Sequence, residues 1–261
     1  MKKLFAFLLV FVCLFVLFGC GEEPEPEPKP EPKEEDIFEK SEGTMTYAQW
    51  EAAEAKAAVV IETFIQAKQS WWEKDGVGGV ASFYTMDKDG GYFIYNMPCS
   101  KEDYDTKLVV GAKIKVTGFK AIYNGLLEVA EGASYEVLKG TYVAKAVELT
   151  ADEFNTNALK YQNQFFSLKN IEVVEFGEDI EGNKLAFGYG WDGSGERGAD
   201  AYFKVKVGET VYSFLVESYL CDKDTAVYQA VEGLKIGDKI SIEGFMYWYK
   251  GAQPHVTKVT K

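Results

Sequence analysis

An internal repeat constrains the fold of this chain more than any other feature of its sequence. Residues 108–125 read LVVGAKIKVTGFKAIYNG, and residues 234–251 read LKIGDKISIEGFMYWYKG. The offset is a constant 126, and eight of the 18 positions are identical, turn glycines among them. Self-similarity of this kind is typical of a structural unit that occurs twice. We therefore expect two related domains, at residues 46–140 and 141–261.

The repeat extends upstream of these segments. Thr46 with Gln49, and Thr150 with Glu153, each form a capping-box pattern that predicts the start of a short helix. A strand-like run follows each helix, at residues 59–67 (VVIETFIQA) and 165–173 (FFSLKNIEV). The predicted order in each copy is helix, strand, strand pair, strand, turn, strand.

Alternation of side chains predicts strands with one buried and one wet face. Ile114 and Val116 alternate with lysines and a threonine, and the matching residues of the second copy behave alike. Turn residues in DKDGG (87–91) and at Asn124-Gly125 predict two hairpins. Five short strands per copy, glycines at the bends and many aromatic residues favour a small, closed or nearly closed barrel.

These residues resemble a known family. GGYFIYN (90–96), followed by KLVVGAKIKVTGFKAIYNGLLEVA (107–130), resembles the OB-fold modules of exported bacterial proteins, including modules that accompany extracellular nucleases. The resemblance covers most of residues 46–138, and residues 141–261 match more loosely, with a glycine-rich insertion (GYGWDGSGERGAD) that has no counterpart. It implies a mainly β chain with two tandem OB-like five-stranded barrels, each preceded by a short helix.

The first residues predict export. Met1-Lys2-Lys3 precede an apolar run from Leu4 to Phe18, which is typical of a signal peptide and short for a membrane-spanning helix. Leu17-Phe18-Gly19-Cys20 resembles the lipobox of bacterial lipoproteins, although Phe18 stands where a small residue is usual. The resemblance implies cleavage after residue 19, acylation of Cys20 with fatty acids such as palmitate, and a protein anchored on the extracytoplasmic face of a membrane. The alternative is a plain secretory signal in which Cys20 is incidental.

Residues 20–45 are predicted to be a disordered linker. Glu22–Asp36 reads EEPEPEPKPEPKEED, and alternating proline with like charges favours an extended spacer. The whole chain carries a formal net charge of −13. Acidic residues also outnumber basic ones in both copies, which argues against strong nonspecific nucleic-acid binding, although Lys113, Lys115 and Lys120 could cluster locally.

Few residues suggest catalysis or metal binding. The single histidine, His255, is interpreted as a strand residue near the surface, and we expect no enzymatic activity, cofactor or metal. Asp87 and Asp89 are explained by a hairpin turn. Asp192, Glu196 and Asp200 form an oxygen-rich group within the insertion, which we interpret as a solvated loop.

Two cysteines remain in the predicted mature domains. Cys99 and Cys221 fall after the third strand of each copy, in equivalent loops. Equivalent positions meet only if the two barrels face each other there, so a disulfide and two free thiols both remain open.

Aromatic side chains are the candidates for ligand contact. OB-folds bind ligands across strands two and three, under the loops after strands one and four. The corresponding residues are Tyr84, Phe93, Tyr95, Tyr123, Tyr202, Tyr212, Phe214 and Tyr249, joined by Trp191 and Trp248 near turns. About half of any aromatic strand faces a core, so packing competes with binding as their role.

The sequence therefore predicts a membrane-anchored, non-enzymatic binding protein with an unidentified extracellular ligand: a glycan, an oligonucleotide or a protein. A passive envelope component, whose modules bind no small ligand, is the alternative.

Overall fold

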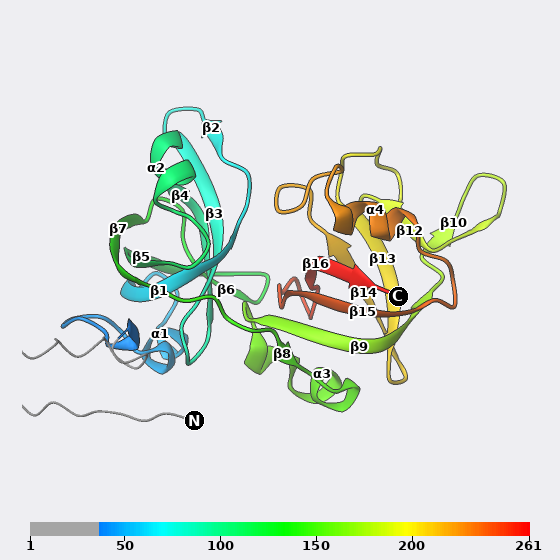
Figure 1. The fold of residues 1–261 in the computed structure, drawn as a ribbon, viewed down its shortest axis with the longest axis horizontal. Helices are drawn as coiled ribbons and strands as arrows, with labels where there is room; N and C mark the ends of the chain where they lie inside the picture. Colours follow the sequence, from blue (N-terminus) through cyan, green and yellow to red (C-terminus); the bar gives the residue numbers. More distant parts are fainter. Residues whose placement is uncertain (1–36) are drawn as a thin grey trace, which may run out of the picture.

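A computed structural model describes residues 37–261 of the chain. The signal peptide, the lipobox with Cys20 and the acidic part of the linker lie outside the described residues, so lipid anchoring stays a prediction. Two β-barrels stand side by side (Figure 1). The predicted fold class, a mainly β chain with two five-stranded OB-like barrels each preceded by a short helix, is confirmed.

Barrel 1 has the strand order of an OB-fold. Its ring runs β1-β3-β4-β6-β5 and closes through the pairing of β1 with β5, and β4 pairs with β6 in parallel. The ring strands are β1 (Ala58–Lys68), β3 (Gly78–Met86), β4 (Gly91–Pro98), β5 (Ala112–Tyr123) and β6 (Leu126–Val129). Two further strands extend the sheet, β2 (Trp72–Lys74) on β3 and β7 (Ser134–Thr141) on β5.

Barrel 2 repeats this order. Its ring runs β9-β13-β14-β16-β15 and closes through β13 and β9, again with one parallel pair, β14 with β16. The ring strands are β9 (Phe165–Val174), β13 (Ala201–Val207), β14 (Thr210–Val216), β15 (Lys239–Phe245) and β16 (His255–Thr260). The added strands are β8 (Val147–Glu148), β12 (Phe187–Tyr189) and the separate pair β10 (Gly177–Glu178) and β11 (Lys184–Leu185).

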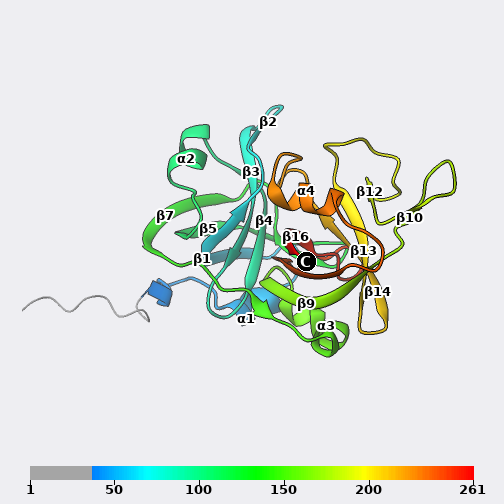
Figure 2. The ribbon, with the colours of Figure 1, turned by 45° about the vertical axis from the view of Figure 1, so that its right-hand side comes forward.

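Short helices lie at the two ends of the barrels. Helices α1 (Tyr47–Ala52) and α3 (Ala151–Asn157) begin at the predicted capping boxes, and a 3-10 turn, η2 (Ala158–Tyr161), follows α3. Two further helices were not predicted from the sequence: α2 (Lys101–Thr106) in barrel 1 and α4 (Ala226–Glu232) in barrel 2. Each connects the third and fourth ring strands of its barrel. In two views, α1 and α3 lie on the lower side and α2 and α4 on the upper side (Figures 1 and 2).

Each barrel has its own apolar core. The predicted alternation is confirmed at Ile114 and Val116 in barrel 1 and at Ile240 and Ile242 in barrel 2, all of which are buried. Both predicted hairpins also form, between β3 and β4 and between β5 and β6. Lys113 departs from the prediction, because its face of β5 is covered rather than wet.

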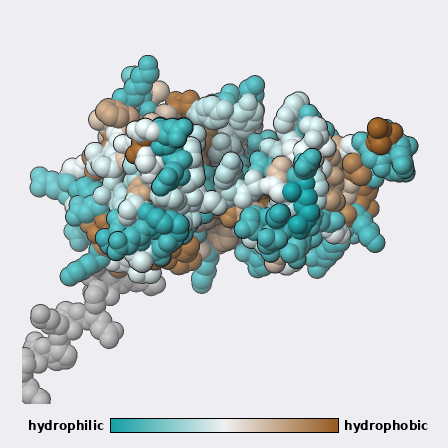
Figure 3. Space-filling model, turned by 90° about the horizontal axis from the view of Figure 1, so that it is seen from above, coloured by the Kyte–Doolittle hydropathy of each residue, from teal (hydrophilic) through white to brown (hydrophobic). Residues whose placement is uncertain are grey.

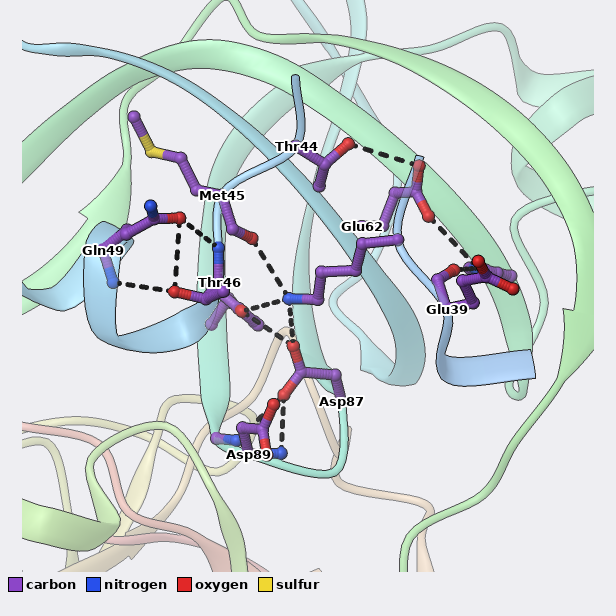
Figure 4. A network of polar contacts seen from close by, with 12 residues as sticks. Glu39, Thr44, Met45, Thr46, Gln49, Glu62, Asp87 and Asp89 are labelled. Atoms are coloured by element: carbon purple, nitrogen blue, oxygen red, sulfur yellow. Dashed lines mark hydrogen bonds and ion pairs between the residues drawn. The ribbon is translucent and has the colours of Figure 1, made fainter. Parts of the chain in front are cut away.

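The segment that covers this face is the N-terminal strap, residues 37–45, which was predicted to belong to a disordered linker. Phe38 packs edge-on against Phe64 and Tyr142, and Lys40 Nζ lies 2.6 Å from Asp87 Oδ2. Ser41 and Thr44 donate hydrogen bonds to the buried carboxylate of Glu62 (Figure 4). Residues 37–45, assigned to the linker from the sequence, therefore pack against barrel 1.

The boundary between the barrels lies slightly later than the predicted position at residue 140. Strand β7 ends at Thr141, and Tyr142 still packs on Phe64 of barrel 1. Strand β8 pairs with β9 of barrel 2, so the connection falls at residues 143–146. No helix within residues 37–261 is long and apolar enough to cross a lipid bilayer.

Candidate ligand-binding groove between the two barrels

The two barrels meet through an aromatic cluster. Tyr84 and Phe93 of barrel 1 pack with Phe245 and Tyr247 of barrel 2. The rings of Tyr84 and Phe245 are stacked, with centroids 4.4 Å apart. The Tyr84 hydroxyl lies 2.9 Å from Nδ1 of His255, which is buried in this interface and not at the surface as predicted. On the side of barrel 1 the contact uses β3 and β4, the second and third ring strands, which form the ligand-binding face of an OB-fold; on the side of barrel 2 it uses β15, β16 and the segment between them.

Hydrogen bonds across the interface fix how the barrels are oriented. The side chain of Gln162 accepts from Leu127 N at 2.7 Å and donates to Gly125 O at 3.0 Å, and Asn163 donates to Leu127 O at 2.8 Å. On the opposite side, Gln69 Nε2 donates to Glu217 Oε2 at 3.0 Å. Directional bonds at both ends of an interface oppose rotation of one barrel against the other.

The remaining parts of the two faces enclose a groove with a volume of about 1050 Å³. Barrel 1 lines it with the loop after β1, with β3, β4 and β6, and with the turn after β5; barrel 2 contributes the equivalent elements. Its lining residues are Gln69, Ser70, Trp72, Ser82, Phe93, Tyr95, Asn96, Tyr123, Glu128, Trp191, Asp200, Tyr202, Leu215, Glu217, Tyr219, Tyr247, Tyr249, Lys250, Gln253 and His255. The two OB faces therefore form one shared site instead of two separate ones.

Viewed from above, the molecule has two lobes that meet at a narrower waist, where side chains of intermediate hydropathy predominate (Figure 3). Several groove aromatics are unusually exposed. Trp191 is 78% and Tyr219 61% exposed, and Tyr123 is 52% exposed. Trp72, Tyr95 and Tyr249 are also exposed. Rings held open to solvent on both walls can stack on flat faces of a ligand.

Six of the ten aromatic residues predicted from the sequence line this groove: Phe93, Tyr95, Tyr123, Trp191, Tyr202 and Tyr249. The structure places the other four elsewhere, for reasons of packing. Tyr84 is buried in the interface, and Phe214 is buried in the core of barrel 2. Tyr212 packs edge-on against Phe154, and Trp248 packs between the barrels beside Gly125.

The sequence did not predict that Trp72, Tyr219 and Tyr247 line the groove, nor did it predict the polar residues of its lining. Trp72 and Tyr219 lie in connections between ring strands. Outside those strands, no alternation of apolar and polar residues shows which side chains face the other barrel. Tyr247 could have been found, because it lies two residues before Tyr249 in the repeated segment and alternates with Trp248.

Two groove carboxyl groups are held away from water. Glu128 and Glu217 are each 8% exposed. Burial raises the pKa of Glu128 to about 7, and burial together with nearby Asp200 raises that of Glu217 to about 7 as well. Burial lowers the pKa of His255 to about 3, so its imidazole is neutral at physiological pH.

The acidic residues singled out from the sequence have local structural roles. Asp87 Oδ1 accepts from the backbone N–H groups of Asp89 and Gly90, which confirms the hairpin turn. Asp192 accepts from Ser194 N, and Asp200 accepts from Ser218 N at 2.8 Å. Within the part of the chain that the structure describes, no group of three or more metal-ligating side chains comes together.

The structure decides between the alternatives for the two cysteines and shows where the three lysines lie. Cys99 and Cys221 follow β4 and β14 as predicted, and both are free thiols. Lys113 pairs with Glu62 at 3.1 Å, and Lys120 donates to backbone carbonyls of α1, so these two lysines do not form an open basic patch with Lys115.

Comparisons with known proteins give structural similarity only. No protein-family model matches the chain, and no curated protein matches it. Among solved structures, a murine DNA-binding protein bound to double-stranded DNA is 10% identical, with a TM-score of 0.37 over 77% of this chain and 95% of that one. The p204 HINb domain is also 10% identical, with a TM-score of 0.35 over 80% of this chain and 100% of that one. A replication protein A heterotrimer bound to single-stranded DNA is 9% identical, with a TM-score of 0.33 over 80% of this chain and 51% of that one.

These TM-scores assign no ligand to this chain, and the OB assignment rests on strand order. They nevertheless correct one expectation, that the acidic charge argues against strong nonspecific nucleic-acid binding. Similar chains are found bound to double-stranded and single-stranded DNA. We therefore withdraw that expectation.

Proposed function

We propose that this chain is a non-enzymatic, lipid-anchored binding protein on the extracytoplasmic face of a membrane, and that its interdomain groove captures a sugar chain. The anchor rests on the signal peptide and the lipobox ending at Cys20. The binding role rests on the groove, in which the ligand-binding faces of two OB barrels point toward each other.

The lining of the groove favours a ligand that has both ring faces and hydroxyl groups. Exposed Trp and Tyr rings on both walls offer stacking surfaces. Amide and carboxyl groups at Gln253, Asn96, Asp200 and Glu217 supply hydrogen-bond partners for hydroxyls. Half of the lining residues are polar or charged, so the groove combines stacking surfaces with hydrogen-bonding groups.

The binding test uses residues 21–261, which lack the acylated cysteine and contain both closed barrels. This protein is screened against a glycan array and a set of single- and double-stranded oligonucleotides. For a glycan found there, Trp72→Ala and Trp191→Ala should each weaken affinity by about tenfold. Ile180→Ala, in the exposed turn between β10 and β11, is the matched control and should leave affinity unchanged.

The other outcomes are also informative. Binding to oligonucleotides alone, with the same loss in the tryptophan variants, would keep the groove and replace the ligand class. Binding to nothing on either array would favour the passive envelope component. Recovery of a bound glycan in intact form would support a binding protein. Recovery of shortened products would instead indicate that the groove hydrolyses glycosidic bonds, with the carboxyl groups of Glu128 and Glu217 as the candidate catalytic groups.

The anchor is tested separately in cells that express the full chain. An alkyne analogue of palmitate should label the wild-type protein and should not label Cys20→Ala. The variant should also move from the membrane fraction to the soluble exported fraction. Labelling of Cys20→Ala at wild-type intensity would contradict the anchor and leave the groove proposal untouched.

A further inference from the structure

Glu128 is exceptional among the buried acidic residues. Four Asp or Glu side chains within residues 37–261 are buried: Glu62, Asp87, Glu128 and Glu217. Glu62 pairs with Lys113, Asp87 with Lys40, and Glu217 accepts from Gln69. The side chain of Glu128 has no hydrogen-bond or ion-pair partner among the described residues.

The position of Glu128 explains why it faces the groove. It lies on β6, beside Phe93 of β4 on one side and opposite Ala121 of β5 on the other. Phe93 and Glu128 both line the groove, and barrel 2 covers this part of the sheet. An unpaired carboxylate in such a position is unfavourable unless something else supplies a partner.

Aromatic rings line the same groove as Glu128. The centroids of Phe93 and Tyr247 are 5.8 Å apart, and those of Tyr123 and Tyr249 are 6.1 Å apart. Burial, and then the field of Glu128, raise the pKa of the Tyr247 hydroxyl, and both side chains line the groove. Faces of aromatic rings attract cations, and the attraction grows when water is excluded.

We propose that Glu128, together with Phe93, Tyr123 and Tyr247, forms a subsite for a positively charged nitrogen of the ligand. This inference rests on the proposed function and specifies one chemical group of the bound molecule. The cation would pair with the carboxylate and lie against the rings. A primary ammonium on a sugar, a quaternary ammonium and a lysine side chain share this chemistry.

The groove carries one basic side chain of its own, Lys250. Its Nζ lies 5.5 Å from the centroid of the Tyr249 ring and is not paired with Glu128. Lys250 would repel a cationic ligand weakly from the rim. Lys250→Met should therefore bind a cation slightly more tightly than the wild type.

The experiment compares probes that differ only in charge. Choline and its neutral carbon isostere, 3,3-dimethylbutan-1-ol, are titrated into the protein and followed by NMR and by calorimetry. Glucosamine against glucose, and 1,5-diaminopentane against pentane-1,5-diol, separate the possible sources of the cation. In at least one pair, the charged probe should bind about tenfold more tightly than the neutral one.

Glu128→Gln should abolish that preference, because it keeps the size and shape of the side chain and removes the negative charge. Glu136→Gln, in the exposed strand β7, is the matched control and should preserve the preference. Equal binding within every pair, no binding of any charged probe, or an unchanged preference in Glu128→Gln would overturn the inference. Glycan binding that depends on Trp72 and Trp191 would still support the proposed function in that case.

The pH dependence provides a second readout. Glu217, Asp200, His255 and Lys250 also line the groove, so they must be separated from Glu128. Affinity for choline, whose positive charge does not depend on pH, should fall by about tenfold from pH 8 to pH 5.5, because Glu128 becomes protonated. Glu217→Gln should retain most of this dependence, and Glu128→Gln should lose most of it. The reverse result would assign the cation to Glu217 and contradict the inference.

Discussion

Barrel 1 and barrel 2 share one strand order but satisfy their buried polar side chains differently. In barrel 1, Glu62, Asp87 and Lys120 find partners within the barrel or in the N-terminal strap. In barrel 2 the buried polar side chains are Gln162, Asn163, Glu217 and His255. All four bond to barrel 1, through Leu127, Gly125, Gln69 or Tyr84.

This difference indicates separate tasks for the two sets of polar groups. In barrel 1, Glu62 and Asp87 attach the strap to the barrel, whereas the buried polar groups of barrel 2 specify how it docks. Because buried polar groups demand partners in defined directions, the docking angle is selected by hydrogen bonding as well as by apolar contact. The groove, which exists only at that angle, depends on the second set.

The largest expected effect tests the internal network of barrel 1. Lys113→Met removes the charged partner of buried Glu62, which keeps only its hydrogen bonds from the strap, and should lower the free energy of unfolding by about 3–5 kcal/mol in urea titrations. Lys169→Met breaks an exposed pair with Glu148 and should cost less than about 1 kcal/mol. A double variant, Glu62→Leu with Lys113→Met, should recover much of the loss. Equal losses in the two single variants would contradict the comparison.

The Glu62 pair also has a defined pH dependence. Burial alone would raise the pKa of Glu62, but hydrogen bonds from Ser41 and Lys113 outweigh it and lower the pKa. The stabilisation is therefore present above the unfolded-state pKa and is lost as the pH falls through the folded-state value. The gap between wild type and Lys113→Met should narrow in acid.

The second effect concerns the one buried acid of barrel 1 that lacks a partner. Burial raises the pKa of Glu128 from 4.5 to about 7, so the folded protein releases this proton less readily than the unfolded chain. Stability should therefore fall as the pH rises from about 4.5 to 7. Glu128→Gln should raise the free energy of unfolding by about 3 kcal/mol at pH 8 and by little at pH 4. If Glu136→Gln gave the same gain, the burial of Glu128 would not be the cause.

The third effect tests the docking of the barrels directly. A methyl group at Gly91 would overlap the backbone of Asn163 and Gln164 in barrel 2. Gly91→Ala should cost about 2–3 kcal/mol and widen the molecule in small-angle X-ray scattering. Gly177→Ala adds a methyl group where nothing lies within 4 Å and serves as the control. An unchanged scattering profile in Gly91→Ala would show that the interface tolerates displacement.

The smallest effect removes one hydrogen bond from the interface. Tyr84→Phe leaves the ring stacked on Phe245 but removes the partner of His255 Nδ1, so it should cost about 1–2 kcal/mol. Tyr212→Phe loses an exposed bond to Asn155 and should change stability by less than about 0.5 kcal/mol. Thermal unfolding of both variants measures the difference. A larger loss in Tyr212→Phe would reverse the assigned importance of the two bonds.

Local features of the fold were predictable from the sequence. The capping boxes at Thr46 and Thr150 and the hairpin turns at Asp87 and Asn124 were identified because each depends on a few neighbouring residues. The repeat then extended these assignments from one barrel to the other. Lys113 was placed on a wet face because strand alternation carries no information about a strap that returns from outside the strand.

The candidate site was predictable only in part, for a related reason. Tyr95 and Tyr123 were found because the OB pattern identifies ligand-facing strands. Tyr84 has the same pattern, but docking of barrel 2 converts its exposed face into an interface. Glu128 could not be identified from the sequence of its own strand. That its carboxyl group is buried without a hydrogen-bond or ion-pair partner becomes evident only when both barrels are in place.

The N-terminal strap determines where mechanical load enters the molecule. In Figure 1 the strap lies at the lower left of barrel 1, whereas β2, whose Trp72 lines the groove, lies at the upper side of barrel 1 toward barrel 2. Tension on the chain before Ile37 would act on the bonds of Lys40 and Ser41 to Asp87 and Glu62. Those residues belong to one barrel, so a pull would be absorbed without prying the two barrels apart. Such a pull would leave the groove between the barrels in its shape.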